Sequence, residues 1–387
     1  MGGGSGVSYM ANRRRRPTGA TDDDGASIRF HRTLPGYAAS PLVDLGEAAA
    51  LAAGVGRLLV KDERERFGLP AFKMLGASWA VYRAVLDRLD RTVDDVQIDL
   101  DGEPFDVLRR AVEPLRPLGL AAATDGNHGR AVARMAAILE MPCQIYVPAG
   151  TVEARISAIE DEDATVTVVD GTYDDAIRVS AQCGEEWLVV SDTSWPGYTD
   201  IPRWVGDGYA TILHELHEQL DSVPDAVVVP LGVGALGAAV AAGLPGHVGA
   251  PPFILGVEPD DAACVRAAVA AGEVVEVPGP HRSMMAGLNC GLASRTALPA
   301  VMDRFDGFAT VSDEACATAL KALAELGFDC GECGAATLAG LTSVVGHVDE
   351  LGPDATVVIL CTEGVTDPDN FRRIVGRGPR EAPLASS

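Results

Sequence analysis

The chain has 387 residues, of which 47% are hydrophobic, 22% are charged and only 5% are aromatic. This composition is typical of a globular α/β protein rather than of a disordered chain, and the length allows two domains of roughly 100–200 residues each. The formal net charge of −24 argues against a nucleic-acid partner, because the phosphate backbone would repel the protein.

Residues 1–25 are expected to form a disordered tail, in which glycines are followed by four arginines and then by three aspartates. No apolar stretch follows the arginines, so the segment does not have the pattern of a secretion signal. Residues 226–246 carry no charge and match the length of a membrane span. Because they contain prolines and several glycines, they are better explained as a buried strand, a glycine loop and a helix. We therefore expect a cytoplasmic protein with no membrane partner.

From Arg57 onward, short β-branched runs alternate with longer alanine-rich stretches. The predicted strands are 57–60, 119–123, 144–147, 165–169, 187–190, 226–229, 253–257 and 356–360. The predicted helices are 74–89, 128–139, 152–160, 173–186, 204–219, 262–271 and 313–326. This alternation predicts an α/β fold with mostly parallel sheets, whose ligands bind at the carboxyl ends of the strands. The acidic stretch 91–105 is a candidate crossing between domains.

Eight cysteines in so long a chain do not indicate the disulfide framework of a small secreted protein. Cys330 and Cys333 form a C-x-x-C pair, which could belong to a zinc or redox site. No second pair of this kind accompanies it, so we predict no metal site.

The glycine loop of residues 232–237 follows a predicted strand and opens a helix. Backbone N–H groups and the helix dipole at such a point suit an anionic phosphate. The loop also satisfies the G-x-G-x-x-G pattern of dinucleotide sites, and Glu258 ends the next strand about 20 residues later, as such sites require. Taken alone, this segment favours NAD, although close helix packing would demand the same small residues.

Two further segments place reactive side chains at helix starts. Lys73 stands among apolar residues, and an amine in such surroundings loses its proton more readily, as Schiff-base chemistry requires. Residues 124–129 end a strand and open a helix, so their backbone donors could hold a carboxylate. The Asn127 amide could bond a phenolic oxygen.

Four motifs, in this order, resemble those of the fold-type II pyridoxal-phosphate (PLP) enzymes, the group of tryptophan synthase β and threonine dehydratase. They are residues 71–73, 125–129, 232–237 and 361–364. More narrowly, the chain is similar to the diaminopropionate ammonia-lyases through residues 30–37, 191–195, 285–291 and 362–368. The resemblance implies a large cofactor-binding domain (26–88 and 203–387), a small domain (89–202), the cofactor in the cleft between them, and a homodimer.

The resemblance also implies roles for individual residues. It assigns the covalent link with PLP to Lys73, the cofactor's phenolic oxygen to Asn127, and its pyridine nitrogen to Cys361. The phosphate is assigned to Gly232, Val233, Gly234, Ala235 and Gly237. Substrate contacts are assigned to Thr124, Asp125, Gly126, His128 and Tyr173. The family usually has Ser at positions 333 and 361, and a pairing of Cys264 with Cys290 is conceivable, although free thiols are expected in the cytoplasm.

The activity implied is elimination of ammonia from 2,3-diaminopropionate, which yields pyruvate and a second ammonia. Asp125 replaces the serine of most dehydratases, and a carboxylate there suits a substrate with a second, cationic amino group. Asp125 and Asp192 are expected as bases on opposite faces of the substrate, serving the D and L forms respectively. The alternatives are a serine or threonine dehydratase or another β-eliminating enzyme, a PLP-binding sensor without activity, and an NAD-dependent dehydrogenase.

Overall fold

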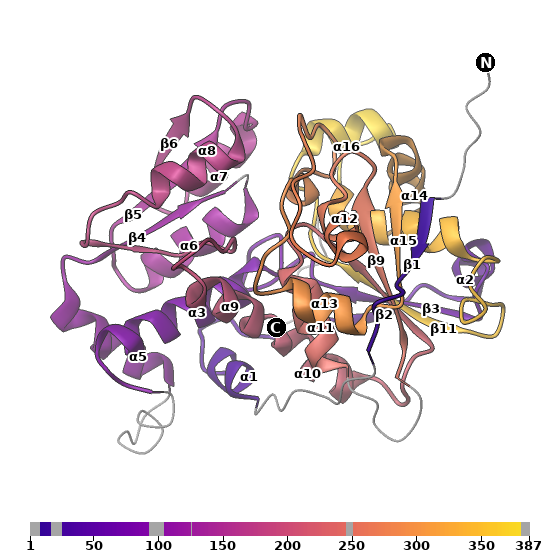
Figure 1. Ribbon diagram of the computed structural model, residues 1–387, viewed down its shortest axis with the longest axis horizontal. Helices are drawn as coiled ribbons and strands as arrows, with labels where there is room; N and C mark the ends of the chain where they lie inside the picture. The colour runs from indigo at the N-terminus through magenta and orange to yellow at the C-terminus, as the bar shows by residue number, and fades with distance from the viewer. Residues whose placement is uncertain (1–7, 17–24, 93–103, 125, 245–250, 381–387) are drawn as a thin grey trace.

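A computed structural model of the protein describes residues 8–16, 25–92, 104–124, 126–244 and 251–380. The strands form two sheets, one of seven strands and one of four, and helices cover both. In Figure 1 the smaller sheet lies to the left, the larger sheet lies to the right, and helices α3 and α9 lie between them. None of the described helices is both long enough and apolar enough to cross a membrane.

The seven-stranded sheet has the order β1-β10-β9-β8-β11-β3-β2. Its neighbouring strands are parallel, except that the two outermost strands, β1 and β2, run antiparallel to the strands beside them. The five inner strands are buried along nearly their whole length, as parallel strands covered on both faces must be. The strands are β1 Ser8–Ala11, β2 Leu42–Asp44, β3 Arg57–Asp62, β8 Ala226–Pro230, β9 Phe253–Pro259, β10 Gly307–Val311 and β11 Thr356–Cys361.

The four-stranded sheet has the order β6-β5-β4-β7, and all its strands are parallel. Its central strand β4 is a completely buried run of small and apolar residues, whereas the edge strand β6 is largely exposed. The strands are β4 Gly119–Ala123, β5 Cys143–Pro148, β6 Thr165–Val169 and β7 Trp187–Val189.

Helices connect most of the parallel strands, as parallel pairing requires. One of them, α15, packs against β8, β9, β10 and β11 of the larger sheet and is buried on nearly every side. The helices are α1 Ala26–His31, α2 Glu47–Ala53, α3 Lys73–Arg88, α5 Pro104–Val112, α6 Asn127–Ile138, α7 Glu153–Glu160, α8 Tyr173–Ser180, α9 Asp200–Gly208, α10 Ala210–Gln219, α11 Ala235–Gly243, α12 Cys264–Ala271, α13 Leu298–Arg304, α14 Asp313–Glu325, α15 Glu332–Val344 and α16 Pro368–Val375.

The chain leaves the larger sheet through α3 and returns to it through α9, and these two helices pack closely against each other. Glycines allow the close approach. A Cβ atom at Gly76 would lie 2.7 Å from the carbonyl oxygen of Val205, and one at Gly208 would lie 2.5 Å from that of Leu75. Such distances are shorter than van der Waals contact, so any larger residue would push the helices apart.

The structure confirms the predicted α/β fold and most predicted elements. Elements such as β2, β10 and α15 were not predicted, and three of the predictions differ from the structure. Residues 8–11, within the expected tail, form β1, which pairs with the open edge of β10. The helix predicted at 204–219 is two helices, α9 and α10, with Tyr209 between them. The helix predicted at 173–186 ends at Ser180.

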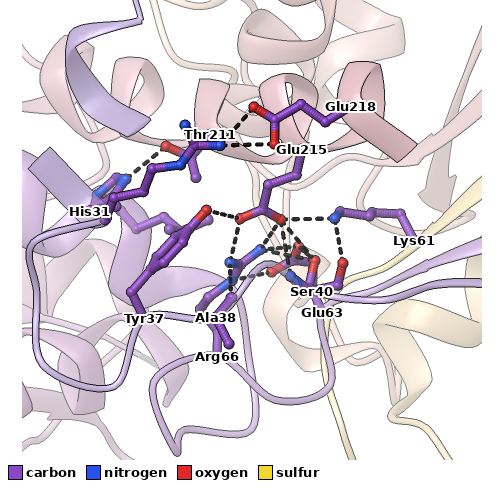
Figure 2. A network of polar contacts seen from close by, with 12 residues as sticks. His31, Tyr37, Ala38, Ser40, Lys61, Glu63, Arg66, Thr211, Glu215 and Glu218 are labelled. Carbon is purple, nitrogen blue, oxygen red and sulfur yellow. Dashed lines mark hydrogen bonds and ion pairs between the residues drawn. The ribbon is translucent and has the colours of Figure 1, made fainter. Parts of the chain in front are cut away.

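A buried network of charged side chains anchors the loop that leads from β3 to Lys73 (Figure 2). At its centre the Glu215 carboxylate accepts hydrogen bonds from Lys61 at 2.8 Å, from Arg66 at 2.7 and 2.9 Å, and from the Tyr37 hydroxyl at 2.9 Å. The side chains of Lys61, Arg66 and Glu215 are at most 1% exposed.

A second carboxylate balances the charge of this network. Glu63 accepts hydrogen bonds from Nε and Nη2 of Arg66 at 2.9 and 2.6 Å and one from the Ser40 hydroxyl. Lys61 also donates to the carbonyl oxygen of Ser40 at 2.7 Å. Two cations and two carboxylates therefore neutralise each other in a buried environment, and together they join α10, β3, the loop after β3 and the segment around Ser40.

Candidate active site

One cavity lies where strands of both sheets end. Its wall includes residues that follow β3, β4, β7, β8 and β11 in the chain, namely Lys73, Thr124, Asp192, Gly232 and Thr362. Its empty space is about 900 Å³ with the open mouth included. The carboxyl ends of parallel strands are the usual place for ligands in α/β proteins, so the cavity is the candidate active site.

Lys73 is the lysine that faces this cavity. The chain contains three lysines; Lys61 is buried in the ion network and Lys321 is exposed on α14. Lys73 is the first residue of α3, and its Nζ lies 5.3 Å from the ring centre of Phe72 and 5.9 Å from that of Tyr209. A primary amine that lines a partly aromatic cavity can act as a nucleophile toward a carbonyl compound.

Asp192 lies directly beside this amine. Its Oδ2 is 3.0 Å from Lys73 Nζ, and its Oδ1 accepts a hydrogen bond from the Tyr173 hydroxyl at 3.2 Å. Burial by itself would raise the pKa of the Asp192 carboxyl. However, the charge of Lys73 and the two hydrogen bonds hold that pKa below its usual value. Asp192 becomes a stronger base whenever Lys73 is no longer an ammonium ion.

Thr124, just after β4 of the smaller sheet, and His128, at the start of α6, bring polar groups to the cavity wall. Thr124 Oγ1 accepts hydrogen bonds from the backbone N–H groups of Gly126 and Gly129 at 2.9 and 3.0 Å, which holds the turn after β4 in place. Burial lowers the pKa of His128, so its ring is neutral, and Nε2 donates to the carbonyl oxygen of Val190 at 2.8 Å. Its Nδ1 has no hydrogen-bond partner within the described ranges and can accept one from a ligand.

Asn127 is the first residue of α6, and its side chain extends toward the larger sheet. Its Nδ2 donates to Oε2 of Glu363 at 2.6 Å, just beyond the end of β11. Asp125, predicted as a base and substrate contact, lies outside the described residues. Of the other predicted substrate contacts, Thr124, Gly126, His128 and Tyr173 all line the cavity.

The glycine loop forms another part of the cavity wall. Gly232, Val233, Gly234 and Ala235 line it, and α11 begins at Ala235. Gly234 has φ +99°, where a larger residue would be strained. A Cβ atom at Gly232 would lie 3.0 Å from the carbonyl oxygen of Gly287, so a side chain at this position would crowd the neighbouring backbone.

Two residues predicted for the cofactor do not line the cavity. Gly237 lies within α11, where a Cβ atom would be 2.7 Å from Leu231, so its small size serves packing of the helix. Cys361 is fully buried, and its Sγ is so close to Gly334 that a Cβ atom there would lie 2.6 Å from it. The thiol of Cys333 lines the cavity instead. Burial raises the pKa of both thiols, which keeps them neutral.

These residues fit PLP better than a dinucleotide. The cavity offers an amine for the aldehyde, a glycine-containing loop at a helix start for the phosphate, and an amide donor for the phenolic oxygen. Glu258, which a dinucleotide site would use for the ribose, is fully buried and accepts from the backbone N–H groups of Val265 and Arg266 at 2.7 and 2.8 Å. It therefore caps the start of α12, and it is absent from the cavity wall.

Several cavity residues were not predicted as site residues. Glu363 and Arg155 are the charged ones, and Phe72 and Asn289 are others. Glu363 belongs to a motif that supported the family resemblance, so its place after a strand was a usable signal. Arg155 lies in α7, and nothing in its local sequence distinguishes it from an ordinary exposed helix residue.

Comparisons with known proteins agree with the geometry. Residues 33–363 match the family described as "Pyridoxal-phosphate dependent enzyme". The diaminopropionate ammonia-lyase of Escherichia coli strain K12 is 35% identical over 373 residues, covering 90% of each chain. A crystal structure of the holo Escherichia coli lyase matches with 30% identity and a TM-score of 0.85, covering 95% of this chain and 96% of that one. A structure of the same lyase in complex with an "aminoacrylate-PLP azomethine reaction intermediate" matches with a TM-score of 0.82. The chain therefore belongs to the pyridoxal-phosphate-dependent enzymes of fold type II, among the diaminopropionate ammonia-lyases.

Proposed function

We propose that the protein eliminates ammonia from 2,3-diaminopropionate and, with one water molecule, yields pyruvate and two molecules of ammonia. The observation that carries this proposal is the position of Lys73, which faces a cavity beside Asp192 in a chain that contains three lysines. The similarity to diaminopropionate ammonia-lyases over 90% of the chain supports the choice of substrate.

PLP, when bound, supplies an electron sink that makes the Cα proton of an amino acid acidic and allows a β-substituent to leave. Lys73 would hold the cofactor covalently, and the loop of Gly232 to Ala235 would hold its phosphate. Asn127 would donate to its phenolic oxygen. The family resemblance assigns the pyridine nitrogen to Cys361, a neutral thiol that is buried and is not part of the cavity wall described above. The turn around Thr124 and Gly126 would bind the substrate carboxylate.

Two carboxylates are available as bases for the Cα proton. Asp192 has the geometry for this task, because it is buried in the cavity wall and oriented by Lys73 and Tyr173. Asp125, which the family resemblance assigns to the substrate, is the second. A carboxylate near the substrate also favours a cationic β-amino group over a hydroxyl, through a charge-assisted hydrogen bond.

The function is tested by the products that the purified holoenzyme forms. Diaminopropionate should give two molecules of ammonia for each pyruvate, at a far higher rate than serine, which would give one. Faster pyruvate formation from serine or threonine would favour a dehydratase. Cofactor binding without turnover of any of these amino acids would favour a PLP-binding sensor.

If Asp125 and Asp192 serve opposite faces of the substrate, their variants should differ in stereochemical effect. We expect Asp192→Asn to lower kcat/KM for L-diaminopropionate by about 10²–10⁴-fold, with a much smaller effect on the D form. Asp125→Asn should show the reverse. The measurement is kcat/KM for both enantiomers in both variants. Equal losses for the two enantiomers would restrict the carboxylates to binding or capping and assign the proton to Lys73.

Replacing Cys361 tests whether a neutral group must face the pyridine nitrogen. Cys361→Ser should keep much of the activity, because a hydroxyl is neutral and of similar size. Cys361→Asp should lower the activity, since a carboxylate would favour protonation of the ring. Because Cys361 is fully buried, thermal unfolding of each holoenzyme is the necessary control. Activity that survives in the Asp variant but not in the Ser variant would contradict the assignment.

We also propose that the protein works in the cytoplasm as a homodimer, with residues 89–202 as its small domain and without nucleic-acid or membrane partners. The net charge of −24 and the absence of any membrane-length apolar helix in the described ranges support the latter two points. The family resemblance alone supports the dimer. Light scattering of the purified holoenzyme measures its mass directly.

A further inference from the structure

The Glu363 carboxylate connects the two sheets at the cavity. Its Oε2 accepts a hydrogen bond from Nδ2 of Asn127 at 2.6 Å, and its Oε1 accepts one from the backbone N–H of Cys333 at 3.2 Å. Glu363 is only 4% exposed, so water competes little for either bond. One carboxylate thus holds the first residue of α6, from the smaller sheet, and the start of α15, from the larger one.

The backbone around Glu363 is held as firmly as its side chain. Glu363 forms a β-bridge with Ala71, and the N–H of Gly364 donates to the carbonyl oxygen of Pro70 at 2.9 Å. The carbonyl oxygen of Glu363 accepts from the N–H of Gly331 at 3.0 Å. Its carboxylate is therefore fixed relative to the loop that carries Lys73, two residues beyond Ala71.

A carboxylate determines which way an amide points. An ionised Glu363 can only accept, so the NH₂ group of Asn127 must face it, and the flipped amide would place two oxygens in contact. The NH₂ group has two hydrogens, and Glu363 Oε2 takes only one of them. The second remains available for a ligand, since Asn127 lines the cavity.

We propose that Glu363 is a positioning residue, which holds the Asn127 amide in the orientation that offers its second N–H to the phenolic oxygen of PLP. This inference rests on the proposed contact between Asn127 and the cofactor. A hydrogen-bond donor stabilises the phenolate anion, and thereby lowers the pH at which the cofactor linked to Lys73 loses its proton.

The direction in which the midpoint of the cofactor's titration moves distinguishes a positioning role of Glu363 from a purely electrostatic one. An anion near the cofactor favours its protonated form, so loss of the Glu363 charge alone would lower the midpoint of the cofactor's titration. Loss of a correctly oriented amide donor would raise the midpoint. Glu363→Gln leaves one acceptor oxygen for two donors. The backbone N–H of Cys333 is fixed and takes this oxygen, so the new NH₂ group faces Asn127 and favours the flipped amide, whose oxygen would repel the phenolate. Positioning therefore predicts a rise in Glu363→Gln.

The experiment is a pH titration of the cofactor's absorption band in the holoenzyme. We expect Asn127→Ala and Glu363→Gln each to raise the midpoint by about one pH unit, and the double variant to show no further shift. Glu363→Asp keeps the charge but withdraws the carboxylate from Asn127, and it should also raise the midpoint. It provides the same test if the Gln variant does not fold.

Glu332→Gln is the matched control. Glu332 is a buried carboxylate that directly precedes Cys333 in the chain. It accepts a hydrogen bond from Nδ2 of Asn370 at 2.5 Å rather than from Asn127. Its variant should not raise the midpoint. A rise in Asn127→Ala with none in the Glu363 variants, or an additive shift in the double variant, would overturn the positioning role alone. No rise in Asn127→Ala would overturn the Asn127–cofactor contact and the positioning role with it.

Discussion

Lys73→Ala is expected to remove the covalent link to PLP and to lower turnover by at least about 10⁴-fold, the upper end of what a single acid–base group contributes. The reason is that Lys73 supplies the amine of the cavity, and neither of the other two lysines lines it. Reduction of the wild-type holoenzyme with borohydride, followed by peptide mass spectrometry, should find the cofactor's mass on the peptide that contains Lys73.

Lys321→Ala is the control, because this residue is exposed on α14. It should leave both the visible absorption band and the labelled peptide unchanged. Recovery of the label on the peptide of Lys61 or Lys321 would show that the cavity described above is not where the cofactor is attached. A covalent label that persists in Lys73→Ala would show the same.

Glu215→Gln is expected to lower the free energy of unfolding by about 3–5 kcal/mol, because it leaves buried Lys61 and Arg66 without their shared counter-charge. Burial by itself would raise the pKa of Glu215, but the hydrogen bonds and charges of Arg66 and Lys61 lower it to about 2. This stabilisation is therefore complete above the carboxyl's unfolded value of 4.5 and is lost as the pH falls from there toward about 2.

Urea unfolding of wild type and variant at neutral pH measures the difference in free energy. Glu218→Gln is a matched control on the same helix, since Glu218 pairs with Arg32 at 2.6 Å but is 57% exposed (Figure 2). Loss of the Glu218–Arg32 ion pair should change the free energy of unfolding by about 0–1 kcal/mol. Similar values for the two variants would mean that water reaches the network and screens its charges.

Short runs of β-branched residues predict strands whether or not the strands are buried. Such runs form β6, which is largely exposed, and β8, which is completely buried, and both strands lie where they were predicted. α15 was not predicted, because a helix buried on nearly every side has no polar face and hence no helical periodicity. β1 was not predicted either. Its four residues become a strand only by pairing with β10, about 300 positions away.

The site residues also fall into two groups: those that a local motif predicts, and those whose role depends on a contact with a distant segment. Lys73, Asn127 and the glycine loop occur in local motifs, and the structure brings them to one cavity. Glu363 was missed as a site residue because its significance depends on Asn127, a partner on the other sheet. Gly237 was assigned to the phosphate, whereas a motif pattern alone cannot distinguish a glycine that approaches a ligand from one that packs a helix.

The close crossing of α3 and α9 has a consequence for motion within the enzyme. Both connections between the sheets run through this helix pair, so any rotation of the smaller sheet must pivot about it. Lys73 begins α3 and would stay near the pivot, whereas Asp192 follows β7 of the smaller sheet and would swing. A change in their separation, which is 3.0 Å here, would therefore report such a rotation, and a rotation that moves Asp192 away would part the carboxylate from the amine.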